Sequence, residues 1–444
     1  MNLRPYQKEA VDALLLFYLQ QGTSSGLCVL PTASGKTVIF SEFIRQLVEI
    51  KPATRVLILA HTQEIVAQNA DKLQRICPQA DIGVCCSGLG RKEIKPITSA
   101  SRDTIYCEIS QYPQWDLVIV DEAHLISPDE LTRYKMILES IRLFSSDVKV
   151  IGFTATPFRT VHGKIYGEEE AAFFSSLIFR KRIDELVNSG YICPVHAVKV
   201  NSAGIADTST VRVTKHDFNA TDLERVTVGQ KLVENIVTDW LSKTSANMPT
   251  VFYASSVAQG EIFEQLLAEQ GFHYPLITAR TPKQDRKQIL NDFDAGLLDG
   301  IVNVATLTTG WDAPRLACIV VARPTLSAAL FMQIVGRGLR LHKGKTETLL
   351  LDYGQNLSRF GVLERVRPVM ENRREFWDTE QVAVCPVCDS IVSVYQLDCP
   401  FCTELLKSEE DISVCYECSA GNDRNAQFCE VCGEELEENK VLFS

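Results

Sequence analysis

The stretch DLVIVDEAHLIS, residues 116–127, places four consecutive apolar residues directly before two carboxylates and an imidazole. The apolar run, Leu117–Val120, predicts a buried strand, with Asp121, Glu122 and His124 at its carboxyl end. In a parallel sheet, ligands bind at the carboxyl ends of the strands. The stretch therefore predicts an α/β fold with a functional site at that end. The alternative is a strand that ends in an exposed polar turn.

Similar apolar runs recur along most of the chain and alternate with stretches of helical length. Continuous apolar strands joined by helices predict parallel sheets covered on both faces. Their spacing predicts two such sheets, one before about residue 180 and one after about residue 230. The predicted strands are 27–32, 55–61, 116–122, 148–156, 250–256, 300–307, 316–324 and 348–353, and predicted helices include 37–50, 257–270 and 283–295.

Composition narrows the class of protein. A chain of 444 residues with 45% hydrophobic content has enough material for two or three domains. Its apolar runs are shorter than a membrane span, so we expect a soluble, cytoplasmic protein without a membrane partner. The net charge is -11, but it is unevenly distributed. Residues 378–444 hold 15 acidic and 3 basic groups, whereas residues 1–377 hold 41 acidic and 42 basic groups. A near-neutral body can still bind nucleic-acid phosphates.

The fifteen cysteines divide into two kinds. Seven are scattered, mostly in apolar stretches, and are interpreted as small core residues. The other eight form two quartets with the spacing C-x2-C-x10-C-x2-C, the second 30 residues after the first. Paired thiolates at this spacing favour tetrahedral Zn²⁺, with a redox or iron–sulfur role as the alternative. The predicted ligands are Cys385, Cys388, Cys399, Cys402, Cys415, Cys418, Cys429 and Cys432.

The segment LPTASGKT, residues 30–37, predicts a phosphate-binding loop between a strand and a helix. Backbone N–H groups at a helix N-terminus face an anion, Lys36 reaches the outer phosphates, and the Thr37 hydroxyl can hold Mg²⁺. Leu30 replaces the leading glycine of the usual pattern, so an incidental turn is the alternative. ATP is the expected ligand, and its predicted contacts in this loop are Thr32, Ser34, Gly35, Lys36 and Thr37.

The loop and the DEAH tetrad occur in the order of motifs I and II of superfamily 2 helicases, and the chain resembles this family. The resemblance implies that Asp121 approaches Mg²⁺, Glu122 orients or deprotonates the attacking water, and His124 senses the neighbouring domain. LRPYQ (3–7) resembles the adenine-reading motif, which implies that Gln7 pairs with the base and Arg4 stacks on it; the alternative is an ordinary helix start. LAHTQEIVAQ (59–68) and TATP (154–157) resemble motifs Ia and III.

Two further segments resemble motifs V and VI, namely TTGWDAP (308–314) and QIVGRGLR (333–340). Arginines three apart predict a shared helical face from which both can reach a γ-phosphate held by the first domain. Exposed surface arginines are the alternative reading. The implied site residues are Gly310, Asp312, Gln333, Gly336, Arg337 and Arg340.

Among these DEAH-box helicase-like ATPases, the phrases TATPFR, NVATLTTGWDAP and QIVGRGLRL most resemble the bacterial RadD family of DNA-repair ATPases. The resemblance implies DNA as the polymer, single-stranded or branched, with single-stranded-DNA-binding protein and recombinase as partners in the bacterial cytosol or nucleoid. Ala33 and TSASRDTI (98–105) depart from the family pattern. The expected organisation is two RecA-like domains, 1–178 and 179–355, a basic linker, 356–384, and two zinc ribbons with an acidic tail, 385–444.

Three other functions stay open. An RNA helicase fits the same motifs, because backbone contacts rarely distinguish the two sugars. A restriction or remodelling motor subunit fits less well, since the sequence lacks an evident nuclease constellation of carboxylates. An ATP-gated DNA-binding adaptor is the third alternative, in which the zinc ribbons recruit a protein. The acidic tail would be repelled by phosphates, so we expect the ribbons to dock a protein or to pack on the core.

Overall fold

The computed structural model divides the chain into two compact units, each formed by three segments. The first unit contains Met1–Cys193, Leu307–Pro314 and Ala329–His342, and the second contains Pro194–Thr306, Arg315–Ala328 and Lys343–Ser444. The structure describes residues 3–20, 25–111, 114–126, 131–159, 163–167, 172–214, 216–245, 248–307, 311–363, 366, 382–408, 412–415, 421–424, 426–427, 429 and 436.

An eight-stranded sheet forms the centre of the first unit, in the order β10-β1-β7-β6-β2-β5-β3-β4. Neighbouring strands are parallel except for β3 and β4. The inner strands consist of buried, mostly apolar residues, as expected for a parallel sheet covered on both faces. Their bounds are β1 (Ser25–Val29), β2 (Val56–Ala60), β3 (Ile82–Cys86), β4 (Arg91–Lys92), β5 (Ile97–Ser101), β6 (Leu117–Asp121), β7 (Lys149–Thr154) and β10 (Ser176–Arg180).

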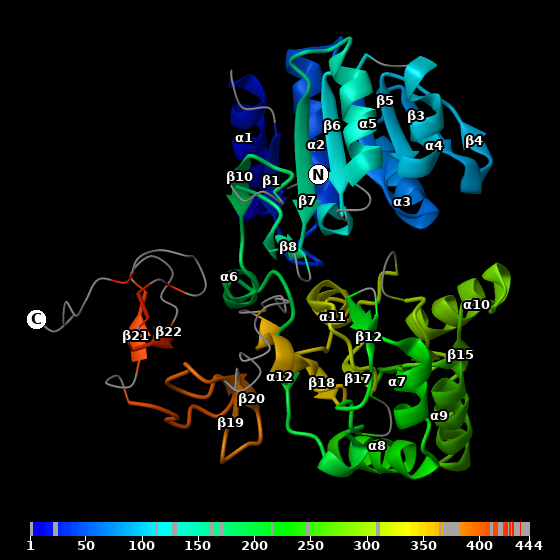
Figure 1. Cartoon of the computed structure of the whole chain (residues 1–444), viewed down its shortest axis with the longest axis vertical. Helices are drawn as coiled ribbons and strands as arrows, with labels where there is room; N and C mark the ends of the chain where they lie inside the picture. The colour runs from blue at the N-terminus through cyan, green and yellow to red at the C-terminus, as the bar shows by residue number, and fades with distance from the viewer. Residues whose placement is uncertain are drawn as a thin grey trace, which may run out of the picture. The chain divides into compact units, whose positions relative to one another are not determined.

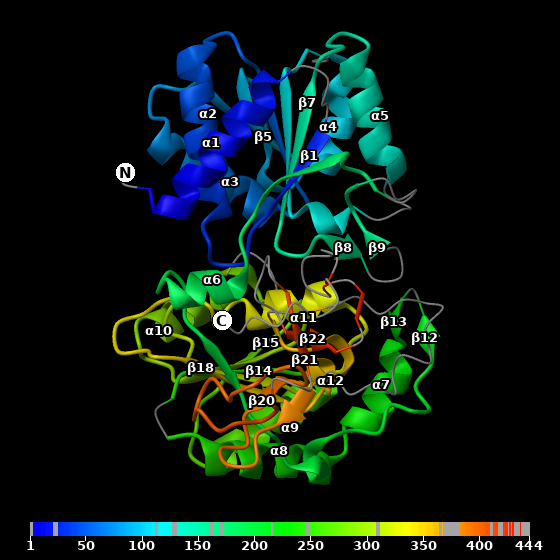
Figure 2. The ribbon, with the colours of Figure 1, turned by 90° about the vertical axis from the view of Figure 1, so that its left-hand side faces the viewer.

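Helices cover both faces of this sheet (Figures 1 and 2). Figure 2 shows α1, α2 and α3 on one face and α4 and α5 on the other. The second of these faces is filled by alternate strand residues such as Leu57 and Leu59, which pack against Trp115 and Tyr134. The helices are α1 (Pro5–Leu19), α2 (Lys36–Ile50), α3 (Gln63–Ile76), α4 (Arg102–Glu108), α5 (Leu131–Arg142) and α6 (Ile183–Asn188), and β8 (Phe158–Arg159) pairs with β9 (Gly163–Lys164).

The second unit contains a six-stranded parallel sheet in the order β11-β18-β17-β14-β16-β15. Trp240 is completely buried beside Phe252 and Tyr274 in its core. The strands are β11 (Val195–Ala197), β14 (Thr250–Tyr253), β15 (Leu276–Ile277), β16 (Gly300–Asn303), β17 (Cys318–Val321) and β18 (Thr348–Asp352), with a hairpin of β12 (Val213–Thr214) and β13 (Asp217–Phe218).

Among the described residues, five helices accompany this sheet along the chain. Four of them are α7 (Ala220–Thr227), α8 (Gln230–Lys243), α9 (Val257–Glu269) and α12 (Asn356–Phe360). The fifth, α10 (Lys283–Asp294), lies close to the predicted 283–295. A further helix, α11 (Ala328–Val335), connects β17 to β18, and all but its first residue belongs to the first unit. None of the described helices has the length and hydropathy needed to cross a membrane.

The cysteine-rich segment forms two short antiparallel hairpins. The first pairs β19 (Val382–Val384) with β20 (Ile391–Ser393), and the second pairs β21 (Ile412–Val414) with β22 (Gly421–Asp423). The predicted fold class is confirmed: the protein is α/β, its two parallel sheets resemble RecA-like domains, and its C-terminal segment brings together four cysteines that can hold zinc. The predicted domain boundaries stay predictions.

Candidate active site

The phosphate-binding loop lies between the carboxyl end of β1 and the first residue of α2. Ser34 closes the loop, because its hydroxyl donates to the carbonyl of Pro31 at 2.7 Å. Gly35 precedes the helix in a left-handed conformation with φ 83°, where glycine is favoured. A Cβ there would lie 2.8 Å from the side-chain nitrogen of Gln7. Lys36 and Thr37 therefore begin α2, whose first N–H groups have no intrahelical acceptor and can face an anion.

Lys36 lies opposite the end of β6. Its Nζ is 3.8 Å from Oε1 of Glu122, and both side chains are largely buried. Glu122 has φ 50°, a left-handed conformation that is uncommon for a residue other than glycine. The turn thus brings the Glu122 carboxylate towards the loop lysine directly after the strand.

Asp121 is held by two hydrogen bonds at the end of β6. The amide nitrogen of Asn69 donates to its Oδ2 at 3.0 Å, and the backbone N–H of Glu122 donates to its Oδ1 at 2.9 Å. Asn69 was missed by the sequence analysis, since the segment compared with motif Ia ends at residue 68. Its position on α3, which precedes β3 and packs near β2, could not be read from local periodicity.

Burial and nearby charges shift the pKa values of the two carboxylates of the DEAH tetrad in opposite directions. Burial, followed by the adjacent Glu122, raises the pKa of Asp121 above its usual range. Burial also raises the pKa of Glu122, but the positive charges of Lys36 and Arg337 outweigh it and lower that pKa overall. Glu122 is therefore the more readily ionised of the two carboxylates, and a nearby cation would lower the pKa of Asp121 and favour its ionised form.

His124 connects three segments of the first unit. Its Nε2 lies 3.0 Å from Nε2 of Gln333, and its Nδ1 lies 2.9 Å from Oγ1 of Thr154. An amide nitrogen can only donate, so Nε2 is the acceptor and Nδ1 carries the proton that it donates to Thr154. Burial lowers the pKa of His124 to about 4, which keeps the ring neutral. The Thr154 hydroxyl in turn donates to the carbonyl of Thr156 at 2.9 Å.

The segment after α11 approaches the phosphate loop within the first unit. A Cβ on Gly336 would lie 2.7 Å from the Cβ of Thr32, so glycine permits this close contact. Arg337 is buried and donates to the carbonyl of Trp311. Arg340 pairs with Asp312 at 2.6 Å, and burial lowers the pKa of its guanidinium against the opposing effect of that carboxylate.

One sequence prediction about this segment was wrong. Arg337 and Arg340 do not share a helical face, because α11 ends at Val335 and both arginines lie in the turns that follow. Gly336 and Gly338 interrupt the helix here, and the N–H of Gly338 bonds to Val335 three residues back. The arginines are therefore positioned by their contacts with Trp311 and Asp312. Gly310, a predicted site residue, lies outside the described residues.

The start of α1 packs against the phosphate loop. Gln7 donates to the carbonyl of Ser34 at 3.1 Å, and the hydroxyl of Tyr6 donates to the same oxygen at 2.6 Å. The guanidinium of Arg4 lies 5.2 Å from the ring centre of Tyr191 and donates to the carbonyl of that residue at 2.8 Å. Tyr6 and Tyr191 were missed by the sequence analysis. An aromatic residue near a loop carries no local signal of a ligand.

The first cysteine quartet fits a tetrahedral metal ion. The sulfur atoms of Cys385, Cys388, Cys399 and Cys402 all lie within 4.8 Å of one another. Zn–S bonds of about 2.3 Å place tetrahedral sulfurs a little under 4 Å apart, so small shifts would accommodate the ion. The residues after each second cysteine, Asp389 and Thr403, both have left-handed φ angles, which gives the two turns the same shape. In the second quartet, Cys415 and Cys429 are described and buried, whereas Cys418 and Cys432 lie outside the described residues.

Comparisons with known proteins give separate matches for an N-terminal and a more C-terminal part of the chain. Residues 1–159 match the family model described as Type III restriction enzyme, res subunit, and residues 230–342 match Helicase conserved C-terminal domain. The IRC3 protein of Saccharomyces cerevisiae, provisionally named an ATP-dependent helicase, is 28% identical over 366 residues, covering 79% of this chain and 51% of the relative. These matches support a superfamily 2 helicase-like ATPase.

Two further relatives are named as a DNA translocase and as a subunit of a restriction enzyme. The DNA 3'-5' translocase XPB2 of Sulfurisphaera tokodaii is 24% identical over 384 residues, which cover 79% of this chain and 81% of that protein. The type I restriction enzyme EcoAI endonuclease subunit of Escherichia coli is 24% identical, with coverage of 79% and 46%. The chain spans between about half and three-fifths of the length of the two fungal helicase-named relatives that it matches.

Solved structures support the α/β fold with two parallel-sheet units. A fragment from Vibrio vulnificus YJ016, provisionally assigned as the HsdR subunit of a type I restriction enzyme, superposes with a TM-score of 0.59 at 22% identity, covering 81% of this chain and 67% of that one. The DNA-bound Type ISP restriction-modification enzyme LlaBIII gives 0.58 at 16% identity, with coverage of 79% and 27%. At such identities the likeness concerns the fold alone.

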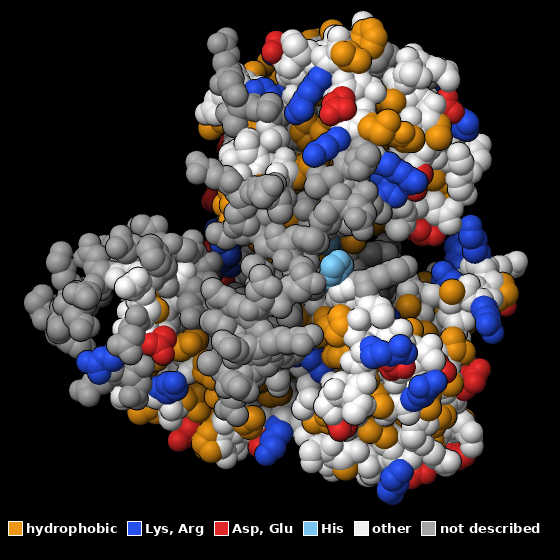
Figure 3. Space-filling view, viewed as in Figure 1, with side chains coloured by type: hydrophobic (Ala, Val, Ile, Leu, Met, Phe, Trp, Pro, Cys, Tyr) orange, Lys and Arg blue, Asp and Glu red, His pale blue; other side chains and the backbone are white. Residues whose placement is uncertain are grey.

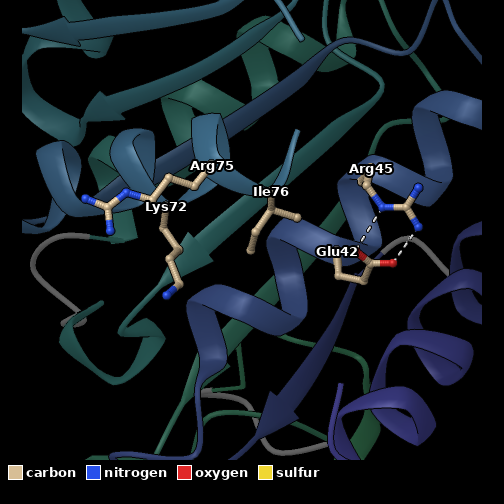
Figure 4. Close-up of a pocket in the computed structure, with 5 residues that line it drawn as sticks. All are labelled: Glu42, Arg45, Lys72, Arg75 and Ile76. Atoms are coloured by element: carbon tan, nitrogen blue, oxygen red, sulfur yellow. Dashed lines mark hydrogen bonds and ion pairs between the residues drawn. The ribbon is translucent and has the colours of Figure 1, made fainter. Parts of the chain in front are cut away.

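A separate pocket of about 320 Å³ lies between α2 and α3. Figure 4 shows Glu42 and Arg45 on one side and Lys72, Arg75 and Ile76 on the other. Arg45 is paired with Glu42 at 2.6 Å, so part of the positive charge is already neutralised. Glu42 lies almost two turns along α2 from the loop lysine, and the lining contains no residue of the phosphate loop. This pocket is therefore distinct from the candidate ATP site.

Proposed function

We propose that this chain is a DNA-stimulated ATP hydrolase that translocates on DNA or remodels it. The observation that carries the proposal is the contact between Gln333 and His124, which joins motif-like segments 209 residues apart beside the phosphate loop. Lys36 and Glu122 face each other on the same side of the sheet. One compact unit contains the phosphate-binding loop, a carboxylate and two guanidinium groups. These are the parts that ATP hydrolysis requires.

The phosphates would bind at the start of α2. Backbone N–H groups of the first turn and the Lys36 ammonium meet the outer phosphates, while Thr37 and Asp121 would hold Mg²⁺. The ion would supply charge neutralisation at the phosphates. Its charge would also lower the raised pKa of Asp121, so nucleotide binding and ionisation of that carboxylate favour each other. Lys36 would then move from Glu122 towards the phosphates.

Glu122 would orient the attacking water and accept its proton. Its lowered pKa keeps it ionised at neutral pH, as an acceptor must be. Arg337 and Arg340 would stabilise the charge that develops on the γ-phosphate, after leaving the Trp311 carbonyl and the Asp312 carboxylate. These two acceptors hold the arginines until a phosphate competes for them.

The base would bind near the start of α1. Gln7 contacts the phosphate loop through the carbonyl of Ser34, so a change at the base would be transmitted to the loop directly. Arg4 stacks on Tyr191, and its other face would be available to adenine. We propose that these residues select adenine.

DNA is the proposed polymer because several relatives are named for activities on DNA. On the face shown in Figure 3, the described Lys and Arg side chains are scattered among acidic and apolar ones, so one basic patch there does not explain binding. The RadD-like phrases of the sequence support a role in bacterial DNA repair. Single-stranded-DNA-binding protein and recombinase would then be partners in the cytoplasm.

The proposal is tested by measuring ATP hydrolysis with no polymer, single-stranded DNA, duplex DNA, forked DNA and RNA. We expect DNA to stimulate turnover most. Glu122→Gln should reduce stimulated turnover by about a hundredfold or more while ATP binding persists, since one positioned acid or base contributes about that factor. Glu139→Gln, a change of an exposed residue on α5, is the matched control. Normal hydrolysis by the Glu122→Gln protein would contradict the proposal.

The same measurements separate the alternatives. Strongest stimulation by RNA would favour an RNA helicase. Binding of DNA that depends on ATP, without stimulated turnover or movement, would favour an adaptor that uses its zinc ribbons to recruit a protein.

A further inference from the structure

Strand β11 is an edge strand of the second sheet, and its outer side contacts the first cysteine-rich hairpin. Directly after β11, Val198 forms an antiparallel bridge with Ser390. The N–H of Lys199 donates to the carbonyl of Asp389 at 2.8 Å. Asp389 and Ser390 immediately follow Cys388, so the backbone that shapes the metal site also covers the sheet edge. Exposed edges are open to non-native pairing, and covering them is a recurrent means of protection.

Side chains reinforce this contact. The ring of His196, in the middle of β11, stacks on Phe401 with a centroid distance of 3.8 Å and an interplanar angle of 13°. The Nε2 of His196 lies 2.8 Å from the hydroxyl of Ser390, and that hydroxyl lies 2.9 Å from the sulfur of Cys388. Ser390 is completely buried. A continuous chain of contacts therefore runs from a sheet strand to a sulfur of the first cysteine quartet.

Both cysteine turns of the first quartet contact β11. Ser390 follows the first pair of cysteines, and Phe401 lies between the second pair. His196 contacts both, so it is sensitive to how the two turns are placed relative to each other. A tetrahedral ion fixes that placement, because it ties all four sulfurs to one centre.

We propose that the first four-cysteine site is a metal clamp that fastens the hairpin to the edge of the second sheet, with His196, Ser390 and Phe401 as the positioning residues that couple the ion to β11. A two-stranded hairpin has little stability of its own, so its shape depends on the metal. Loss of the ion then releases the hairpin and exposes β11. The clamp is independent of ATP hydrolysis.

Hydrogen exchange of the full-length zinc-loaded protein tests this clamp. After removal of zinc by a chelator, amides 195–199 should exchange about tenfold faster or more, the change produced by local opening of an edge. Amides of the central strand β14 should change little, because parallel strands flank it on both sides. Cys402→Ser should bind one zinc fewer per chain and show the fast exchange without chelator. Unchanged protection at 195–199 in a protein whose first site has lost zinc would overturn the proposal.

Two variants separate the coupling from metal binding itself. His196→Ala and Phe401→Ala leave the four cysteines intact, so we expect them to retain zinc and still lose protection at 195–199. His273→Ala, which changes an exposed histidine of the same unit, is the control and should match the unsubstituted protein. Full protection in both the His196 and Phe401 variants would refute their role as positioning residues.

Discussion

The side-chain nitrogen of Gln333 lies 3.0 Å from Nε2 of His124, in a contact between residues 209 positions apart. Because Gln333 donates, the imidazole proton is on Nδ1 and is directed to Thr154 at the end of β7. Three segments that end beside the phosphate loop are thus connected through one neutral ring. A change in the position of Gln333 would alter the proton arrangement at the carboxyl ends of both β6 and β7.

Removing this contact should lower ATP turnover more than ATP binding. We expect Gln333→Ala to reduce stimulated turnover by about tenfold, corresponding to about 1.4 kcal/mol in the barrier. His124→Asn should have a similar effect, and the double variant should be little worse than either, since both changes remove the same contact. Gln74→Ala, on the exposed side of α3, is the control. Fully additive losses would contradict coupling through the pair.

The neutral state of His124 predicts a pH dependence of stability. Its pKa is lowered to about 4 in the folded protein, so between that value and the ordinary 6.5 the unfolded chain binds a proton that the folded chain does not. The contribution of His124 to the free energy of unfolding is therefore complete above about pH 6.5 and is lost as the pH falls towards 4. Asp121 has the opposite sign, because its raised pKa makes its contribution decline as the pH rises through that pKa.

Urea unfolding of the unsubstituted protein and of His124→Asn between pH 4 and 6.5 measures the histidine contribution. The difference in unfolding free energy should grow by up to about 3 kcal/mol with rising pH, since one pKa unit is worth about 1.4 kcal/mol. In an Asp121→Asn background, which removes the opposing titration of that carboxylate, the difference caused by His124→Asn should keep the same pH dependence. Parallel curves for the unsubstituted protein and the histidine variant would mean that His124 titrates normally.

Ala33 lies in the phosphate loop with φ 68°, a conformation that favours glycine. Ala33→Gly should remove the steric cost of the Cβ, and the greater freedom of glycine in the unfolded chain should offset part of the gain. We expect the unfolding free energy to rise by about 0.5–1 kcal/mol, with ATP binding retained. Equilibrium unfolding checks this, with Ala70→Gly in the helix α3 as a control that should destabilise. Destabilisation by Ala33→Gly would contradict the strained conformation.

The close approach of Gly336 to Thr32 predicts sensitivity to one added methyl group. Gly336→Ala would place its Cβ 2.7 Å from both the Thr32 Cβ and the backbone oxygen of Met332. Displacement of this segment should destabilise the protein by about 1–3 kcal/mol and lower ATP turnover. In Gly229→Ala, the new Cβ has its nearest neighbour at 3.8 Å, which makes it the control. Unaltered turnover and stability in Gly336→Ala would show that the contact is dispensable.

Much of the fold could be predicted because its strands are short apolar runs. The predicted 116–122 and 55–61 correspond to β6 and β2 within a residue at each end. Strands in the second unit end earlier than predicted, as at Asn303, where the predicted 300–307 continued. Hydrophobicity extends beyond a strand wherever the following loop is also buried, as at Leu307. The pattern of apolar residues indicates which residues are buried. It indicates less directly which residues form the hydrogen bonds of a strand.

The candidate site was less predictable than the fold. Lys36 and Glu122 could be paired in advance, because parallel strands end at the same edge of a sheet. The helical face expected for Arg337 and Arg340 was wrong, since two nearby glycines end α11 first. Asn69 gave no signal, because an asparagine within a helix is usually a surface residue.

The amino-acid sequence by itself determined the alternation of strands and helices, the order of the phosphate loop and DEAH tetrad, and the spacing of the cysteines. These are properties of neighbouring residues, and local chemistry is sufficient to specify them. Only the tertiary structure decided that Gln333 meets His124, that Asn69 holds Asp121, and that His196 stacks on a cysteine turn. Contacts between distant segments depend on how whole elements pack, which no local pattern encodes.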